Sequence, residues 1–218
     1  MQMTGMIIKM EFPLSQMLLA LPWKMFLRRP KGIKNIPKDK GFIIASNHCS
    51  YMDHLLISGV FIPYMKKRVR FLAKKEHFEG FFQKAWHEWT GAIPIDRQAG
   101  GKKALKEAIK QLRKREVIGI YPEGTRSLTG KIQQGKTGAA RLALAAKVPV
   151  LPVGLIGTFD IMPKGKNIPK LKRADMNIGK QMYFDKYYGQ EDNKKVIRRV
   201  TDSIMKEIAK LSKQKYKF

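Results

Sequence analysis

Short apolar runs alternate with helix-like segments along this chain, and this alternation limits the possible folds more than any other feature. The runs at residues 41–46, 69–73, 92–95, 117–121 and 148–156 have the length and composition of buried strands. Alternating strands and helices are typical of a mostly parallel sheet that helices cover. We therefore predict a single α/β domain with a mostly parallel central sheet flanked by helices.

The segments between the strands show helical spacing of apolar residues. Helices are expected over residues 53–61, 80–89, 105–112 and 137–147. The C-terminal segment predicts an amphipathic helix, with an apolar stripe made by Val196, Val200, Ile204, Ile208 and Leu211. Pro149 and Pro152 indicate that the strand at 148–156 lies at a sheet edge or has an irregular hydrogen-bond ladder.

The charge balance selects for anionic partners. Lys and Arg number 44 against 17 Asp and Glu, which gives a formal net charge of +27. The basic residues are dispersed, and no recognition helix or zinc pattern appears, so we expect no specific nucleic-acid partner. The single cysteine, Cys49, excludes an intramolecular disulfide framework and a cysteine-rich zinc module. An H-x-H-x-D-H metal motif is also absent, because Cys49 and Tyr51 occupy its upstream histidine positions.

Residues 1–36 form a hydrophobic and basic segment that precedes the predicted domain at 37–218. Charged, polar and proline residues interrupt its apolar stretches, so no uncharged 18-residue span exists. Its apolar part runs into the basic cluster Arg28, Arg29, Lys31 and Lys34, which is the reverse of a cleavable signal peptide. We expect a helical segment in the membrane interface, while packing on the protein's own core remains an equal alternative.

A histidine and an aspartate follow the first predicted strand. His48 precedes Asp53 by five residues, which a continuous helix would place about 140° apart. The two side chains can meet only if His48 lies in the loop and Asp53 in the first helical turn. Such a pair leaves one imidazole nitrogen free to take a proton from a hydroxyl nucleophile. Taken alone, the spacing favours a loop histidine beside an aspartate that only caps the helix.

Two further strand ends carry polar residues. Arg97 ends the run at 92–95, and the sequence Glu123-Gly124-Thr125-Arg126 follows the run at 117–121. In a parallel sheet these ends share the carboxyl edge, where ligands bind in open α/β folds. The edge would then combine a base, guanidinium groups suited to phosphate, and backbone N–H groups around Gly124.

Four ordered blocks give the chain a resemblance to a known family. They are NHCSYMD at 47–53, GAIPIDR at 91–97, YPEGTRS at 121–127 and VPVLPVGL at 148–155. In these blocks the sequence resembles the glycerolipid acyltransferase family, and within it the 1-acyl-sn-glycerol-3-phosphate acyltransferases. The family usually has Phe at the position of Tyr121.

The resemblance implies an acyltransferase of phospholipid biosynthesis. It would move a fatty acyl group from acyl-CoA or acyl-carrier protein to the sn-2 hydroxyl of lysophosphatidic acid, forming phosphatidic acid without a cofactor or metal. His48 would be the general base and Asp53 its partner. The residues implied for acceptor and phosphate binding are Arg97, Glu123, Gly124, Thr125, Arg126 and Lys136. Another lysophospholipid or glycerol 3-phosphate stays open as acceptor.

The resemblance and the positive charge together predict a peripheral or monotopic protein on the cytoplasmic face of the cell membrane, held there by an anionic surface. Two other chemistries compete with this interpretation. Residues 130–137 fit the phosphate-loop pattern G-x-x-x-x-G-K-T of nucleotide hydrolases, although no strand directly precedes them. Cys49 or Ser50 could carry an acyl group covalently, although a neighbour of His48 is expected to point away from it.

Overall fold

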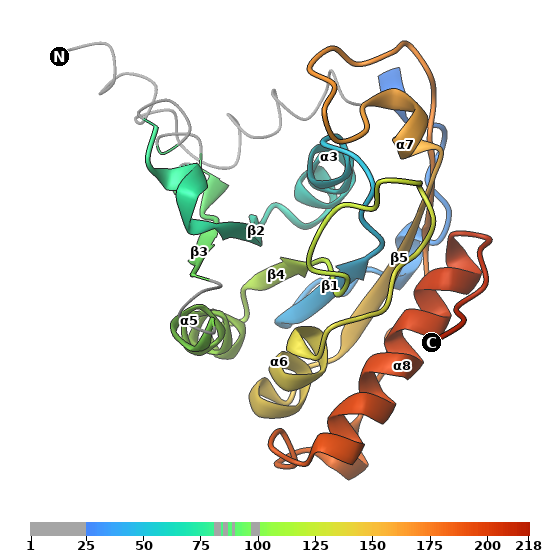
Figure 1. Cartoon of the computed structure of the whole chain (residues 1–218). Coiled ribbons are helices and arrows are strands. Elements are labelled where there is room, and N and C mark those ends of the chain that lie inside the picture. Colours follow the sequence, from blue (N-terminus) through green and yellow to red (C-terminus); the bar gives the residue numbers. More distant parts are fainter. Residues whose placement is uncertain (1–24, 81–83, 85–86, 89, 97–100) are drawn as a thin grey trace, which may run out of the picture.

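A computed structural model describes residues 25–80, 84, 87–88, 90–96 and 101–218 (Figure 1). Six strands form one sheet in the order β3-β2-β4-β1-β5-β6. All neighbouring pairs are parallel except β5 with β6. The strands are β1 (Phe42–Ser46), β2 (Val69–Lys74), β3 (Ile93–Ile95), β4 (Val117–Ile120), β5 (Val150–Ile156) and β6 (Asp175–Ile178). The predicted mostly parallel α/β sheet is confirmed.

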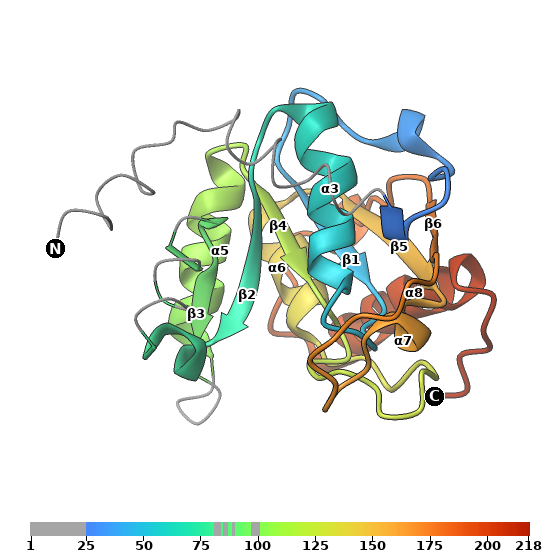
Figure 2. The same ribbon diagram turned by 90° about the horizontal axis from the view of Figure 1, so that it is seen from above.

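Helices cover both faces of the sheet (Figures 1 and 2). α3 (Asp53–Met65) packs on one face, and α5 (Lys102–Arg113), α6 (Gly138–Ala146) and α8 (Lys194–Leu211) pack on the other. The remaining elements are short: α7 (Thr158–Ile161), η2 (Ile33–Asn35), η3 (Lys75–Phe78) and η4 (Asp185–Tyr187). The helix predicted at 80–89 falls mostly on positions outside the described residues.

The central strand β1 shows how the sequence builds two cores. Its five residues are all buried, as expected for a strand covered on both faces. Ile43 and Ala45 pack with the cluster under α5, α6 and α8, whereas Phe42 and Ile44 pack with the cluster under α3. Alternation with a period of two therefore supplies apolar side chains to both layers and fixes the end of β1 at Ser46.

The prediction that Pro149 and Pro152 mark a sheet edge is wrong, and the alternative of an irregular ladder is right. β5 lies between β1 and β6, with Pro152 in register with Ala45. The Pro152 carbonyl accepts from Gly179 N–H on the β6 side at 2.9 Å. On that side Val153 pairs with Ile178, and Val150 pairs with Met182. The segment from β6 to Met182 therefore carries one residue more than the stretch of β5 opposite it, which includes Pro152. The missing proline N–H faces this interruption.

The last described part of the predicted N-terminal segment lies against β6. Arg28 N–H donates to the Ala174 carbonyl and Lys31 N–H to the Met176 carbonyl, both at 2.9 Å. Phe26 is buried in the cluster under α3. Residues 1–24 lie outside the described residues, so an interfacial role of the segment stays a prediction. Within the described part of the chain, no helix is long and apolar enough to cross a membrane.

We predict that Gly154→Ala destabilises the fold. A Cβ on Gly154 would lie 2.3 Å from the Leu211 carbonyl carbon and 2.4 Å from Ser212 N, both backbone atoms at the end of α8. Relieving this overlap must shift β5 or α8, which costs about 1–3 kcal/mol. Urea denaturation measures the free energy of unfolding. Gly138→Ala is the matched control, because its Cβ would meet only Ile120 Cδ1 at 3.5 Å. Equal stability of the two variants would contradict the close packing of α8 on β5.

Candidate active site

His48 and Asp53 meet at the carboxyl end of β1, in the one arrangement that their spacing allows. His48 lies in the loop after β1, and Asp53 is the first residue of α3. His48 Nδ1 lies 2.7 Å from Asp53 Oδ2. A carboxylate in this position accepts a hydrogen bond from Nδ1–H and leaves Nε2 free to accept a proton from another group. The His48 side chain is 17% exposed while Asp53 is fully buried, so the base is accessible and its partner is not.

Asp53 also fixes the loop that carries His48. Its Oδ2 accepts the main-chain N–H groups of Cys49 and Ser50, each at 2.8 Å. Both donors belong to the loop that precedes α3, so the Asp53 side chain reaches back from the first residue of the helix to bind them. One buried oxygen therefore sets both the imidazole orientation and the path of the chain around it.

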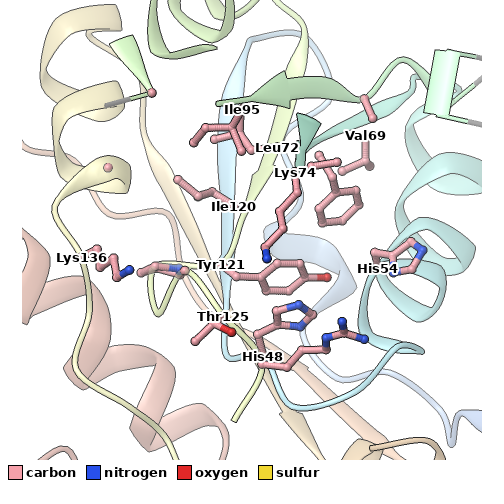
Figure 3. Close-up of a pocket in the computed structure, with 18 of the residues that line it drawn as sticks. His48, His54, Val69, Leu72, Lys74, Ile95, Ile120, Tyr121, Thr125 and Lys136 are labelled. Carbon is pink, nitrogen blue, oxygen red and sulfur yellow. The ribbon is translucent and has the colours of Figure 1, made fainter. Parts of the chain in front are cut away.

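The Tyr121 ring packs against one face of the His48 imidazole. The rings of His48 and Tyr121 stack with centroids 3.8 Å apart and an interplanar angle of 9° (Figure 3). The Tyr121 hydroxyl is buried without a hydrogen-bond partner among the described residues, and burial holds its pKa well above the ordinary value. The aromatic ring at this family position thus positions the base through stacking, which the sequence alone did not reveal.

Glu123 binds its own chain with both carboxylate oxygens. Oε1 accepts His48 N–H at 2.8 Å, and Oε2 accepts the main-chain and side-chain N–H groups of Gln133 at 3.0 and 3.1 Å. Gln133 Nε2 also donates to the Thr125 carbonyl at 3.1 Å. These contacts give Glu123 a positioning role between the His48 loop and residues 121–136. In the sequence, Gln133 is only a variable position of the phosphate-loop pattern at 130–137, which gives no sign of this contact.

The remaining predicted residues after β4 turn toward the same place. Gly124 adopts φ +74°, a left-handed conformation that favours glycine, and a Cβ there would lie 3.0 Å from Lys136 Cδ. Lys136 is held by its N–H, which donates to the Pro122 carbonyl at 2.7 Å. The Arg126 guanidinium carbon lies 3.5 Å from the centre of the Tyr51 ring, a cation–π contact. Arg97 lies outside the described residues.

A cavity of about 590 Å³ opens beside His48 (Figure 3). Polar residues line it near the strand ends, including Thr125, Arg126 and Lys136. Much of its other lining is apolar and comes from α3, β2, β3, β4 and α5: Leu55, Ile62, Val69, Phe71, Leu72, Ile95, Leu105 and Ile120. A cavity with one basic, polar end and a long apolar wall fits an amphiphilic anion.

Two lining residues were not selected from the sequence. Lys74 ends β2, and Figure 3 shows its side chain pointing toward Tyr121 and His48. Its place at a strand end was the signal that could have identified it. His54, expected to be an ordinary helix or surface residue, lines the cavity from α3. Burial first, and then the nearby His48, lowers the pKa of His54 to about 4. At neutral pH it is therefore an uncharged cavity wall.

The family sequence profile described as Acyltransferase matches residues 28–156, which is more than half of the chain. The chain belongs to the acyltransferase family. A 1-acyl-sn-glycerol-3-phosphate acyltransferase of Bacillus subtilis is 30% identical over 165 residues, covering 73% of this chain and 78% of the relative. One from Borreliella burgdorferi is 34% identical over 61% of this chain and 52% of its own length.

The fold agrees with this membership. A crystal structure of the 1-acyl-sn-glycerophosphate acyltransferase from Thermotoga maritima superposes with a TM-score of 0.69 at 24% identity. The match covers 98% of this chain and 90% of that chain. The single-domain α/β architecture is therefore shared by the two proteins over nearly their whole lengths.

The surroundings of Cys49 argue against a covalent acyl-enzyme in this acyltransferase. Its thiol is buried and lies 3.1 Å from Thr158 Oγ1. Burial, together with the charge of Asp53, raises the pKa of Cys49 to about 12, which keeps the thiol protonated. The Ser50 hydroxyl donates to the Met162 carbonyl at 2.8 Å and accepts from Met52 N–H. Neither group is paired with His48 as an activated nucleophile would be.

The phosphate-loop pattern at 130–137 is not a nucleotide site in this acyltransferase. A working loop of this kind binds phosphate with free main-chain N–H groups. Here Ile132 N–H donates to Gln214 Oε1, Gln133 N–H to Glu123 Oε2, and Gly135 N–H to the Tyr216 hydroxyl. Side chains of the segment after α8 and of Glu123 therefore bind these N–H groups.

We predict that Glu123 makes stability depend on pH. Burial raises the pKa of its carboxyl from 4.5 to about 7, although the N–H groups of His48 and Gln133 oppose the shift. Between these pH values the folded state holds more protons than the unfolded state. The free energy of unfolding therefore falls as the pH rises from about 4.5 to about 7, by at most on the order of 3 kcal/mol from this group.

Denaturation of the wild type and Glu123→Gln across pH 4.5–8 tests this prediction, because the substitution removes the titrating group. The difference between their slopes isolates Glu123. Glu79→Gln removes an exposed carboxyl and controls for the loss of one acidic residue. Parallel curves for wild type and Glu123→Gln would show that the Glu123 carboxyl does not titrate in this range.

Proposed function

We propose that this acyltransferase moves a fatty acyl group from acyl-CoA or acyl-carrier protein to the sn-2 hydroxyl of 1-acyl-sn-glycerol 3-phosphate, forming phosphatidic acid. The observation that carries the proposal is the His48–Asp53 pair beside a cavity with a basic end and an apolar wall. The names of the relatives from Bacillus subtilis and Borreliella burgdorferi support this choice of acceptor over other lysophospholipids or glycerol 3-phosphate.

The proposed reaction is a direct transfer. His48 Nε2 takes the proton of the acceptor hydroxyl as its oxygen attacks the thioester carbonyl carbon. The C–O bond forms, the tetrahedral intermediate collapses, and the C–S bond breaks. The departing thiolate takes the proton from the imidazolium, so the products are an ester and a free thiol. Asp53 stabilises the imidazolium between these two proton transfers.

Charge and shape divide the substrate between the two parts of the cavity. Arg126 and Lys136 lie at the polar end and would hold the phosphate, with Arg97 as the further predicted contact. Gly124 and Thr125 form the turn against which the glycerol would lie. The apolar wall between α3 and β2 would take an acyl chain. We place the enzyme in phospholipid biosynthesis, at the cytoplasmic face of the cell membrane.

The proposed chemistry uses no cofactor, because the acyl thioester is already an activated donor. The described part of the chain holds no cluster of three or more His, Cys, Asp or Glu suited to a metal ion. Competition between acyl-CoA and acyl-carrier protein of several acyl lengths in one assay identifies the preferred thiol carrier and the preferred chain length.

We predict that His48→Ala and Asp53→Asn each lower kcat by about 10²-fold to 10⁴-fold, because one removes the proton acceptor and the other its orienting charge. The measurement is formation of phosphatidic acid, followed by mass, from lysophosphatidic acid and both donors. Circular dichroism establishes that the variants are folded.

Cys49→Ser is the matched control, since it alters a side chain next to His48 that the direct mechanism does not use. It is expected to retain wild-type kcat. Retained turnover in folded His48→Ala, or accumulation of acylated protein that disappears in Cys49→Ser, would contradict direct transfer. Product only with a different lysolipid would keep the chemistry and change the acceptor.

We predict a different kinetic signature for the basic residues. Arg126→Ala and Lys136→Ala each remove one cation from the polar end of the cavity, and each should raise KM for lysophosphatidic acid about tenfold with a smaller effect on kcat. Lys147→Ala, at an exposed residue after α6, controls for the loss of one positive charge. An unchanged KM in both variants would remove these residues from phosphate binding.

A further inference from the structure

The loop between α7 and β6 exposes apolar side chains to an unusual degree. Within the described part of the chain, Ile168 and Leu171 are the most exposed large apolar residues, each at 82%. Isolated apolar residues on a surface are common, but two at this exposure within four positions form a projecting apolar tip. We name residues 162–173 the basic apolar loop.

The same loop is strongly basic. It contains no aspartate or glutamate, and its cations are all exposed: Lys164, Lys166, Lys170, Lys172 and Arg173. Of these side chains, Lys172 has an acidic neighbour in Asp160, at 4.0 Å. A short segment that combines exposed apolar residues with clustered cations has the composition of surfaces that enter the interface of an anionic bilayer.

The basic apolar loop is attached to the loop that carries His48. The Met162 carbonyl accepts both the Ser50 hydroxyl, at 2.8 Å, and Tyr51 N–H, at 3.1 Å. Both Ser50 and Tyr51 line the cavity. A surface that binds the basic apolar loop would therefore lie close to residues that line the cavity beside His48.

A further exposed apolar residue comes from a different loop. Leu128, in the segment after β4, is 69% exposed. That segment contacts α7, since the Gly130 position lies against the Phe159 ring. In both ribbon views the segment after β4 and the basic apolar loop flank α7 (Figures 1 and 2). The exposed apolar side chains thus come from two loops at one end of the molecule.

The described end of the N-terminal segment adjoins the same loop. Arg173 Nε donates to the Met25 carbonyl at 3.2 Å, and Arg28 donates to the Arg173 carbonyl at 3.0 Å. Met25 is itself 52% exposed. The described residues 25–28 therefore lie beside the basic apolar loop and add the exposed Met25 side chain to the same surface.

We propose that the basic apolar loop is a docking surface for an anionic lipid bilayer, in which Ile168 and Leu171 enter the acyl boundary while the loop's cations lie among the headgroups. Leu128 extends this surface along the segment after β4 that contacts α7. The inference deepens the proposed function, because it supposes that the acceptor is delivered from a membrane. An acidic carrier protein would satisfy the lysines, but it would leave the projecting Ile168 and Leu171 without a matching environment.

Binding of the full chain to vesicles of phosphatidylglycerol and phosphatidylcholine tests the proposal. Ile168→Ser with Leu171→Ser removes the apolar tip and should lower the vesicle partition coefficient about tenfold or more. Phe218→Ser is the matched control, since Phe218 is 59% exposed at the C-terminus. Unchanged binding of the Ile168→Ser, Leu171→Ser variant would overturn the proposal.

A charge-reversal pair tests the electrostatic part. Lys166→Glu with Lys170→Glu should lower binding to anionic vesicles about tenfold, with a loss that shrinks as salt is added. Lys194→Glu with Lys195→Glu changes the net charge equally on the first turn of α8, away from the loop (Figure 1), and should bind nearly as well as wild type. Equal losses in the two pairs would show a general charge effect and overturn a specific surface.

Activity distinguishes this proposal from the proposed function. With a short-chain lysophosphatidate dissolved as monomers, the loop variants should turn over acyl-CoA at the wild-type rate, whereas with vesicle-borne lysophosphatidate they should be slower. A loss confined to acyl-carrier protein as donor, with vesicle binding intact, would assign the loop to the carrier and overturn the proposal. Vesicle binding is measured without turnover, so an inactive wild type would refute the proposed function alone.

Discussion

The geometry of the site depends on a single oxygen, Asp53 Oδ2, which is buried and accepts three hydrogen bonds. Burying a carboxylate costs several kcal/mol unless donors compensate it. Here the compensation comes from His48 Nδ1 and from the N–H groups of Cys49 and Ser50, at the start of α3. Because the same bonds that stabilise the buried charge also orient the imidazole, folding of the loop and positioning of the base are one event. Strand β1, which is covered on both faces, ends directly before the loop that carries His48.

A second buried carboxylate, that of Glu123, binds the main chain of the same histidine. Glu123 binds His48 N–H, while Ser127 N–H donates to the His48 carbonyl at 2.8 Å. Glu123 in turn binds Gln133, and the segment around Gln133 is tied to the C-terminus through Gln214. Distant parts of the sequence therefore converge on one loop. Burial raises the pKa of the Glu123 carboxyl, although the N–H groups that it binds oppose the shift.

Features that depend on local pattern were predictable from the sequence, and features that depend on tertiary contacts were not. Strand β1 and the meeting of His48 with Asp53 followed from apolar periodicity and from helix geometry. β6 escaped because it is only four residues long, although those residues alternate polar and apolar as a half-buried strand does. Gln133 escaped because its partners are ten and eight positions away across an irregular loop. Pro152 was misassigned to an edge because the segment that pairs with β5 contains one extra residue. That residue accommodates the proline, and the sequence of β5 gives no sign of it.

The arrangement of polar and apolar groups around His48 follows from the topology of the sheet. The carboxyl ends of β1 and β4 bring His48, Arg126 and Lys136 to one end of the cavity, because parallel strands place their following loops at the same edge. The residues that precede those ends are buried-strand residues, so the cavity becomes apolar as soon as it passes Ile120 and Phe71. In the proposed reaction, an amphiphilic acceptor would be oriented by this contrast, with its charged group at the polar end near His48. The change from strand to loop would then help to select the reacting hydroxyl.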